Sequence, residues 1–151
     1  VLNETNREFG GLDVLILNVG GNASAFGFPV ELSEWHRVFE LNFIGSAIMA
    51  TLGMEYLKKS AGNIIFVSSI AGLEDFGSPA AYMAAKASLQ AFVKSLSREL
   101  GPHGVRVNAV APGNVLFSGS VWDRRLNDDA DQDHKAQKSQ HVQGLVNEGV
   151  G

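Results

Sequence analysis

Short apolar runs alternate with longer segments of helical periodicity over the first 110 residues of the chain. The runs occupy residues 14–17, 64–67 and 105–110. Apolar runs of this length are typical of strands that are buried on both faces of a parallel sheet. Because the runs alternate with helical segments, the pattern predicts an α/β fold built from βαβ units.

The segments around these runs carry the periodicity of helices. A first helix is expected at 2–9, and a second begins near Ser33, which would serve as its N-cap. A third, at 42–59, is apolar around much of its girth, so we expect it to be buried on more than one side. A fourth spans 80–100 and ends where Gly101-Pro102 follows it.

The chemical signal of the chain begins where the second apolar run ends. Ser69 closes that run, and this places a hydroxyl at the carboxyl end of a buried strand. Tyr82 and Lys86 follow, one turn apart on the same face of the fourth helix. A buried ammonium needs a partner, and a phenol beside it loses its proton more easily because the positive charge stabilises phenolate. The pair would suit proton transfer near neutral pH.

Five blocks of the sequence, in this order, resemble one protein family. They are Asp-Val-Leu-Ile-Leu-Asn-Val-Gly at 13–20, the stretch 35–42, Ser-Ser-Ile-Ala-Gly at 68–72, Tyr82 with Lys86, and Val-Arg-Val-Asn-Ala-Val-Ala-Pro-Gly at 105–113. Together they resemble the catalytic half of a short-chain dehydrogenase/reductase, over residues 1–122. The resemblance implies a partial Rossmann-type, doubly wound parallel sheet with three strands and flanking helices. It also implies an oxidoreductase that transfers hydride between a nicotinamide cofactor and a carbonyl or secondary alcohol.

The resemblance assigns roles to four side chains. Tyr82 would exchange a proton with the substrate oxygen, while Lys86 would lower the pKa of that tyrosine and hydrogen-bond the nicotinamide ribose. Ser69 would hydrogen-bond the substrate oxygen where charge develops. Asn42 would position a water molecule that links Lys86 to solvent.

The cofactor implied is NAD or NADP, and the choice between them stays open. Leu17 and Val19 replace the family's usual Asn and Ala in the first block. The residues expected to contact the cofactor are Asn18, Gly20, Tyr82, Lys86, Pro112, Gly113 and Val115. The partner implied is a small-molecule carbonyl or alcohol substrate.

Structural explanations stand beside these functional ones. Tyr82 and Lys86 could belong to an ordinary helix surface. Ser69 could merely cap the strand end. The adjacent Ser68 is a second candidate serine, and its side chain is expected on the opposite side of the strand. Asn42 could be a simple helix N-cap.

Composition narrows the classes of protein. The 151 residues contain no cysteine, 45% apolar residues and a formal net charge of −4, with basic residues scattered along the chain. This argues against disulfides, thiol chemistry and nucleic-acid binding. The four histidines lack metal-ligand spacing, and no run of 18 apolar residues indicates a membrane span. A cytoplasmic location without membrane or nucleic-acid partners is the expectation.

The first half of a dinucleotide site has no counterpart in these residues. Neither Gly-x-Gly-x-x-Gly nor the family's Thr-Gly-x-x-x-Gly-x-Gly occurs, and the chain starts at Val1. We therefore expect a fragment that lacks the N-terminal Gly-rich segment and the C-terminal end, and that is inactive alone. The alternative is a truncated or degenerate, non-catalytic relative that retains only an assembly role.

Two further expectations concern organisation. Residues 1–122 would form the catalytic part of the oxidoreductase domain, and 123–151 a polar tail, either disordered or a surface helix. The helix at 42–59 has an outer apolar side that a lone subunit cannot cover. In the resembled family this helix and the one at 80–100 form the dimer interface, so a homodimer or homotetramer is expected.

Overall fold

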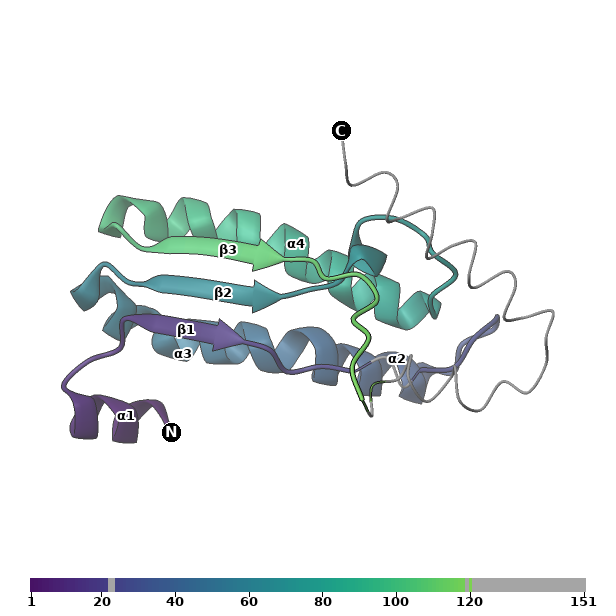
Figure 1. Ribbon diagram of the computed structural model, residues 1–151, viewed down its shortest axis with the longest axis horizontal. Coiled ribbons are helices and arrows are strands. Elements are labelled where there is room, and N and C mark those ends of the chain that lie inside the picture. The colour runs from purple at the N-terminus through teal and green to yellow at the C-terminus, as the bar shows by residue number, and fades with distance from the viewer. Residues whose placement is uncertain (22–23, 119, 121–151) are drawn as a thin grey trace. The chain divides into compact units, whose positions relative to one another are not determined.

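A computed structural model describes residues 1–21, 24–118 and 120 of the chain. The chain divides after Gly113, and residues 1–113 form a compact unit of the α/β class. Its sheet has three parallel strands, β1 (Val14–Leu17), β2 (Asn63–Val67) and β3 (Arg106–Val110), in the order β1-β2-β3 (Figure 1). The predicted α/β fold with a three-stranded parallel sheet is confirmed.

The register of the strands brings their apolar side chains into rows. Leu15 pairs with Ile64, which in turn pairs with Val107, and all three side chains are buried. Since the strands are parallel, their carboxyl ends lie at the same edge of the sheet, where the loops after each strand emerge. β2 starts at Asn63, one residue before the predicted run. β3 starts at Arg106, one residue later than predicted, and these two residues pair with each other.

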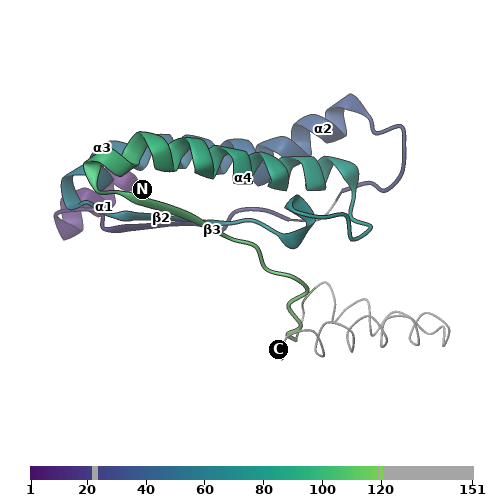
Figure 2. The same ribbon diagram turned by 90° about the horizontal axis from the view of Figure 1, so that it is seen from above.

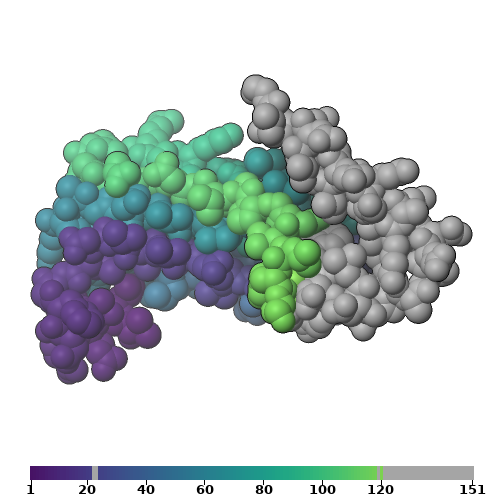
Figure 3. Space-filling view, in the orientation of Figure 1, coloured from purple at the N-terminus to yellow at the C-terminus, as the bar shows by residue number. Residues whose placement is uncertain are grey.

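The helices that pack on this sheet lie on one of its faces. These are α3 (Gly45–Ser60) and α4 (Ala80–Leu100), which Figure 2 shows side by side over the strands. On the opposite face, the side chains of Val14 and Ile16 in β1 are 50% and 61% exposed. Figure 3 shows side chains of all three strands at the surface on this open face. The predicted burial of the strands on both faces is therefore not met within the described residues.

The hydrophobic core fills the space between the sheet and the two helices. Phe66 at its centre is fully buried and contacts Phe92 edge-on, with ring centroids 5.9 Å apart. Phe92 contacts Phe43 in the same way, which links α4 to the helical turn just before α3. The buried members are Leu15, Leu17, Ala50, Leu57, Ile64, Phe66, Leu89, Val93, Leu96, Leu100, Val105 and Val107.

The helices predicted near Ser33 and at 42–59 form one continuous helical stretch. α2 (Leu32–Phe39) passes through a π-helical turn, Glu40–Ile44, directly into α3. Backbone angles stay in the right-handed helical region from Phe39 to Gly45, so the chain does not break there. The alternative that Asn42 is a helix N-cap is therefore wrong, because this residue lies inside the π-turn.

The predicted N-cap of α2 is also wrong. Ser33 lies within the first turn, and Glu31 occupies the cap position without a side-chain cap hydrogen bond. The carboxylate of Glu34 instead accepts a hydrogen bond from the Ala25 N–H at 3.0 Å. The loop before α2 is thus hydrogen-bonded to Glu34, the third residue of the helix.

Helix α3 turns its small residues inward and large apolar residues outward. Ser46, Ala50 and Gly53 are buried on the inner side, so the helix backbone can approach the sheet closely. Ile48 and Leu52 on the outer side are 53% and 59% exposed. The predicted burial of this helix on more than one side is not met by the part of the chain that the structure describes.

The remaining helices agree with the sequence. α1 spans Leu2–Phe9 and ends at Gly10, whose φ of 76° is the left-handed conformation that glycine adopts readily. α4 has the predicted bounds, and a short 3₁₀ turn, Gly101–His103, follows it. A second 3₁₀ turn, Ile70–Gly72, lies between β2 and α4.

The predicted domain boundary at 122 and the tail 123–151 lie outside the described residues. Of the second unit, 114–118 and 120 are described, and the Ser120 N–H donates to the Phe117 carbonyl at 2.9 Å. Among the described residues, no helix is long and apolar enough to cross a membrane. No group of three or more acidic or histidine side chains there could hold a metal ion.

Candidate active site

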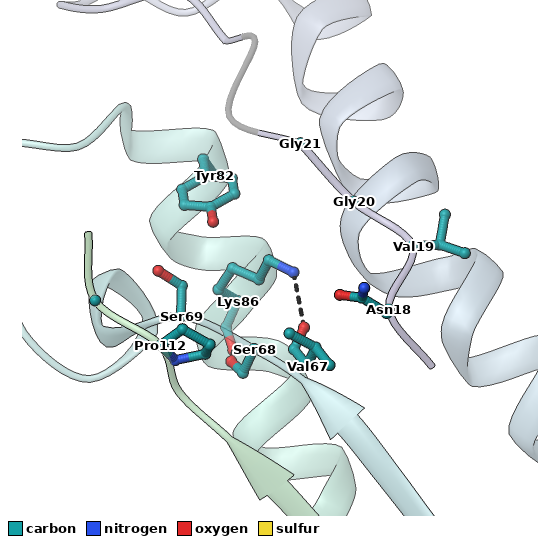
Figure 4. A pocket seen from close by; sticks show the side chains of 11 residues that line it. Asn18, Val19, Gly20, Gly21, Val67, Ser68, Ser69, Tyr82, Lys86 and Pro112 are labelled. Carbon is teal, nitrogen blue, oxygen red and sulfur yellow. Dashed lines mark hydrogen bonds between the residues drawn. The ribbon is translucent and has the colours of Figure 1, made fainter. Parts of the chain in front are cut away.

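The candidate site lies at the carboxyl edge of the sheet, beside the N-terminal half of α4. A cavity of about 230 Å³ opens there (Figure 4). Each of the three strands sends its following loop to the cavity wall, and α4 supplies the remaining side. The lining residues are Asn18, Val19, Gly20, Gly21, Val67, Ser68, Ser69, Tyr82, Lys86, Pro112 and Gly113.

Tyr82 and Lys86 face this cavity from the same side of α4, as their spacing predicts. The Lys86 Nζ lies 5.9 Å from the centroid of the Tyr82 ring. The ring also packs against a small cluster made by Val38, Ala81 and Ala85, which joins α4 to α2. The phenol is thus held by apolar contacts near a positive charge.

Lys86 carries that charge into the interior, with 4% of the residue exposed. Its ammonium donates to the Val67 carbonyl at 3.1 Å, drawn as a dashed line in Figure 4. Burial lowers the pKa of Lys86, because desolvation disfavours the charged form. An ammonium has three N–H donors, so two remain beyond the one that Val67 accepts within the described residues.

Ser69 stands at the end of β2 with its hydroxyl in the cavity. Its Oγ accepts a hydrogen bond from the Ala71 N–H at 3.2 Å and thereby caps the turn Ile70–Gly72. This contact uses a lone pair of the oxygen, so the hydroxyl hydrogen can still be donated. Figure 4 shows the Ser69 hydroxyl on the same side of the cavity as the Tyr82 phenol. A capping role and a donor role are therefore compatible.

Asn42 lies behind the cavity wall and is fully buried. Its Oδ1 accepts from the Gly21 N–H at 2.9 Å, and its Nδ2 donates to the Val38 carbonyl at 3.0 Å. The π-turn places this amide between the helix and the loop after β1. The described contacts of Asn42 thus fix the cavity wall through Gly21.

Gly20 brings the loop backbone against two of these side chains. A Cβ added at Gly20 would lie 2.8 Å from the Asn42 Oδ1 and 3.0 Å from the Lys86 Nζ. Real Cβ atoms essentially never come this close to a neighbour, so only glycine fits without displacement. The contact explains why a glycine follows the strand at this position.

An ion pair anchors the same loop further along. Arg37 hydrogen-bonds the Glu34 carboxylate at 2.9 Å and, together with the Ala25 N–H, lowers the pKa of Glu34 to about 2. A carboxylate with a lowered pKa contributes this contact above its ordinary pKa and loses it as pH falls through the lowered value. The anchor is therefore fully present at neutral pH.

The structure brings most of the predicted site residues together. Within the cavity lining are Asn18, Gly20, Ser69, Tyr82, Lys86, Pro112 and Gly113. Asn42 contacts the wall from behind, whereas Val115 belongs to the second unit and its position relative to the cavity stays a prediction. Sequence reasoning missed the Val67 carbonyl and the Ser68 hydroxyl. For the first, the sequence indicated only that a buried ammonium requires an acceptor, and not which carbonyl supplies it.

The donors and the glycine-lined wall fit part of a nicotinamide nucleotide. The two remaining N–H groups of Lys86 suit adjacent ribose hydroxyls, which are neutral acceptors. Gly20, Gly21 and Gly113 lack side chains, so a flat ring or sugar can approach their backbone. No part of this cavity carries a cluster of metal ligands among the described residues.

Comparison with known sequences agrees with this geometry. A family model described as short chain dehydrogenase matches residues 1–128. Trans-4-hydroxycyclohexanecarboxylate dehydrogenase of Sinomonas cyclohexanicum is 39% identical over 109 residues, which are 72% of this chain and 42% of that protein. The 3-oxoacyl-(acyl-carrier-protein) reductase of Escherichia coli K12 is 36% identical over 134 residues, 85% of this chain and 52% of that protein. The chain spans about half the length of these curated relatives.

Solved structures show the same likeness. The acetoin dehydrogenase from Enterobacter cloacae superposes with a TM-score of 0.71 at 27% identity, covering 79% of this chain and 50% of that one. A short-chain type dehydrogenase/reductase from Mycobacterium marinum has a TM-score of 0.69 at 28% identity, covering 74% and 46%.

Proposed function

Because the chain belongs to the short-chain dehydrogenase family, we propose that its cavity interconverts a secondary alcohol and a carbonyl compound with NAD or NADP. The observation that carries this proposal is the Lys86 ammonium buried near the Tyr82 ring, with the Ser69 hydroxyl in the same cavity. The three groups together can bind an oxygen and exchange a proton with it. For the small-molecule substrate, the proposal specifies only a secondary alcohol or a carbonyl group.

Each residue has a separate task in the proposed reaction. A bound nicotinamide would accept or supply the hydride at the substrate carbon. In the direction of reduction, the Ser69 hydroxyl donates a hydrogen bond to the carbonyl oxygen, and Tyr82 transfers its phenolic proton to that oxygen. In the direction of oxidation, the tyrosine oxygen accepts the alcohol proton. The Lys86 charge stabilises the tyrosine oxygen whenever it is left negative.

The names of the relatives are consistent with this chemical class. They include a dehydrogenase of a hydroxycyclohexane carboxylate, L-fucose dehydrogenase of Bos taurus and a 3-oxoacyl reductase. Each of these substrates carries a hydroxyl or carbonyl group on a carbon skeleton, but the skeletons differ widely. We therefore propose the reaction type for this chain and leave the skeleton open. No observation on the described residues favours the alternative that this chain is a non-catalytic relative.

The test replaces the proposed proton carrier. Tyr82→Phe keeps the ring and its packing but removes the transferable proton, which costs about 10²–10⁴-fold in rate. The assay follows the oxidation of NADH and NADPH with a panel of ketones, and the reduction of NAD and NADP with secondary alcohols. It uses a preparation that shows turnover before the substitution is made. The other tyrosine supplies the matched control, because the Tyr56 hydroxyl contacts Asn3 at 2.6 Å, outside the cavity lining. Tyr56→Phe should leave turnover unchanged, and equal rates in both variants would refute the assignment of Tyr82.

A further inference from the structure

Two consecutive residues contact Lys86 at its two ends. The Ser68 hydroxyl donates to the Lys86 backbone carbonyl at 3.2 Å. The Lys86 ammonium returns to donate to the Val67 carbonyl at 3.1 Å. The end of β2 therefore holds both the backbone and the charged group of the same residue on α4.

The turn after β2 closes on the same point of the helix. A Cβ added at Gly72 would lie 2.6 Å from the Lys86 carbonyl carbon and 2.8 Å from its oxygen. The chain thus passes directly against the helix backbone at Lys86, with the Ser68 hydroxyl bound to the same carbonyl. The two neighbouring serines differ in their described contacts, because the Ser69 oxygen accepts a hydrogen bond from Ala71 while the Ser68 hydroxyl donates one to α4.

A serine hydroxyl can also satisfy a carbonyl with no further consequence. Ser88 on α4 is such a case, because its Oγ donates to the Ala84 carbonyl one turn earlier in the same helix. The Ser68 contact differs, because it joins a strand end to a helix across 18 positions and is buried. Loss of the Ser88 bond would remove a contact within one helix, whereas loss of the Ser68 bond would remove a contact between the end of β2 and α4.

We propose that Ser68 is a positioning residue that holds the Lys86 backbone at the end of β2, so that the ammonium stays buried against the Val67 carbonyl near Tyr82. A role of Ser68 in catalysis rests on the function proposed above. The contact between Ser68 and the Lys86 backbone does not depend on that function. Without the hydroxyl, the Lys86 side chain can swing away from Val67 and gain water. The expected effect is a rise in the Lys86 pKa toward its ordinary value, because burial is what lowers it.

The surroundings of Lys86 limit what can change its titration midpoint. The groups described around it are the neutral Val67 carbonyl, the Tyr82 ring, and the neutral Asn42 amide, which lies near Gly20 as Lys86 does. Within the described residues, no carboxylate forms an ion pair with Lys86. A change in its midpoint therefore reports a change in solvation or in the distance to Tyr82.

The experiment follows the Lys86 side chain by NMR in the full 151-residue chain labelled with ¹³C,¹⁵N-lysine, with Lys86→Arg used to assign the signal. Ser68→Ala should raise the Lys86 midpoint by about half a pH unit or more, a roughly threefold change in the ratio of ammonium to amine. Ser68→Thr keeps a hydroxyl and should restore the wild-type midpoint. Ser88→Ala, the matched control, should leave it unchanged.

Ser68→Cys serves if the alanine variant does not fold, because a thiol has similar size but is a weak donor. The proposal is overturned if the midpoint in a folded Ser68→Ala or Ser68→Cys chain equals that of the wild type. It is equally overturned if Ser88→Ala raises the midpoint as much. Since the readout is the titration of one lysine and not turnover, an active Tyr82→Phe variant would refute the proposed function and leave this inference standing.

Discussion

At the scale of single residues, the site depends on close approaches that allow no extra atoms. A Cβ added at Gly20 would meet both the Asn42 amide oxygen and the Lys86 ammonium. Asn42 cannot move aside, because both ends of its amide are hydrogen-bonded. The Lys86 ammonium can move only by leaving the Val67 carbonyl. Because position 20 carries no side chain, the Lys86 ammonium can stay buried against the Val67 carbonyl.

Gly20→Ala should disturb this arrangement. The new methyl would displace the Lys86 ammonium or the loop, at a cost of about 1–3 kcal/mol in the free energy of unfolding. Chemical denaturation with a fluorescence readout measures the loss. Gly21→Ala is the neighbouring control, since its Cβ would meet the Leu41 Cδ2 at an ordinary 3.8 Å. Equal stability of the two variants would show that the loop yields without strain.

At the scale of elements, the position of α4 is set by contacts to its backbone. The turn Ile70–Gly72 packs on α4 at Lys86, with Gly72 against main-chain atoms. Main-chain atoms of a helix interior cannot rotate away as a side chain can. The distance between β2 and α4, and with it the distance between Ser69 and Tyr82, therefore depends on this glycine.

Gly72→Ala should separate the turn from α4 and destabilise the fold. Overpacking against a fixed backbone costs about 1–3 kcal/mol or more, and the midpoint of urea denaturation should fall accordingly. Gly101→Ala provides the comparison, because a Cβ there has no neighbour within 4 Å. A Gly72→Ala chain with the stability of Gly101→Ala would mean that the turn relocates freely.

The elements also show where sequence reasoning succeeds and where it stops. The bounds of α4 were predictable, because the apolar stripe begins after a proline and ends at Gly101-Pro102. The π-turn was not, because one extra residue in a helix leaves no break in composition between Ser33 and Lys59. The side-chain partners of the site were predictable as residue types. The Val67 carbonyl as the acceptor for Lys86 was not, since every residue carries such a group.

At the scale of the whole molecule, the chain presents two apolar surfaces in its first unit. One is the outer side of α3 with Ile48 and Leu52, and the other is the open face of the sheet with Val14 and Ile16. β1 is also an edge strand of the three-stranded sheet. Fully burying a leucine or isoleucine side chain contributes roughly 1.5–3 kcal/mol, so covering these surfaces would be favourable.

We expect the purified chain to form dimers or larger species through the outer side of α3. Light scattering coupled to size exclusion measures the mass. The double variant Ile48→Glu with Leu52→Lys should shift the population toward the monomer, because charges replace the exposed apolar groups. Lys59→Glu, a charge change at the exposed end of the same helix, is the control. A wild-type chain that elutes as a monodisperse monomer would contradict this prediction.

Within the described residues, the helices cover only one face of the sheet, and this has a consequence for how stability varies with temperature. The heat capacity of unfolding grows with the apolar surface that unfolding exposes, and is roughly 12–15 cal/mol/K per residue for ordinary globular proteins. Since the outward side chains of β1 already meet solvent in the folded chain, unfolding hydrates less new apolar surface. The heat capacity change per residue should therefore fall below that range. The stability curve of the isolated chain is correspondingly less curved about its maximum.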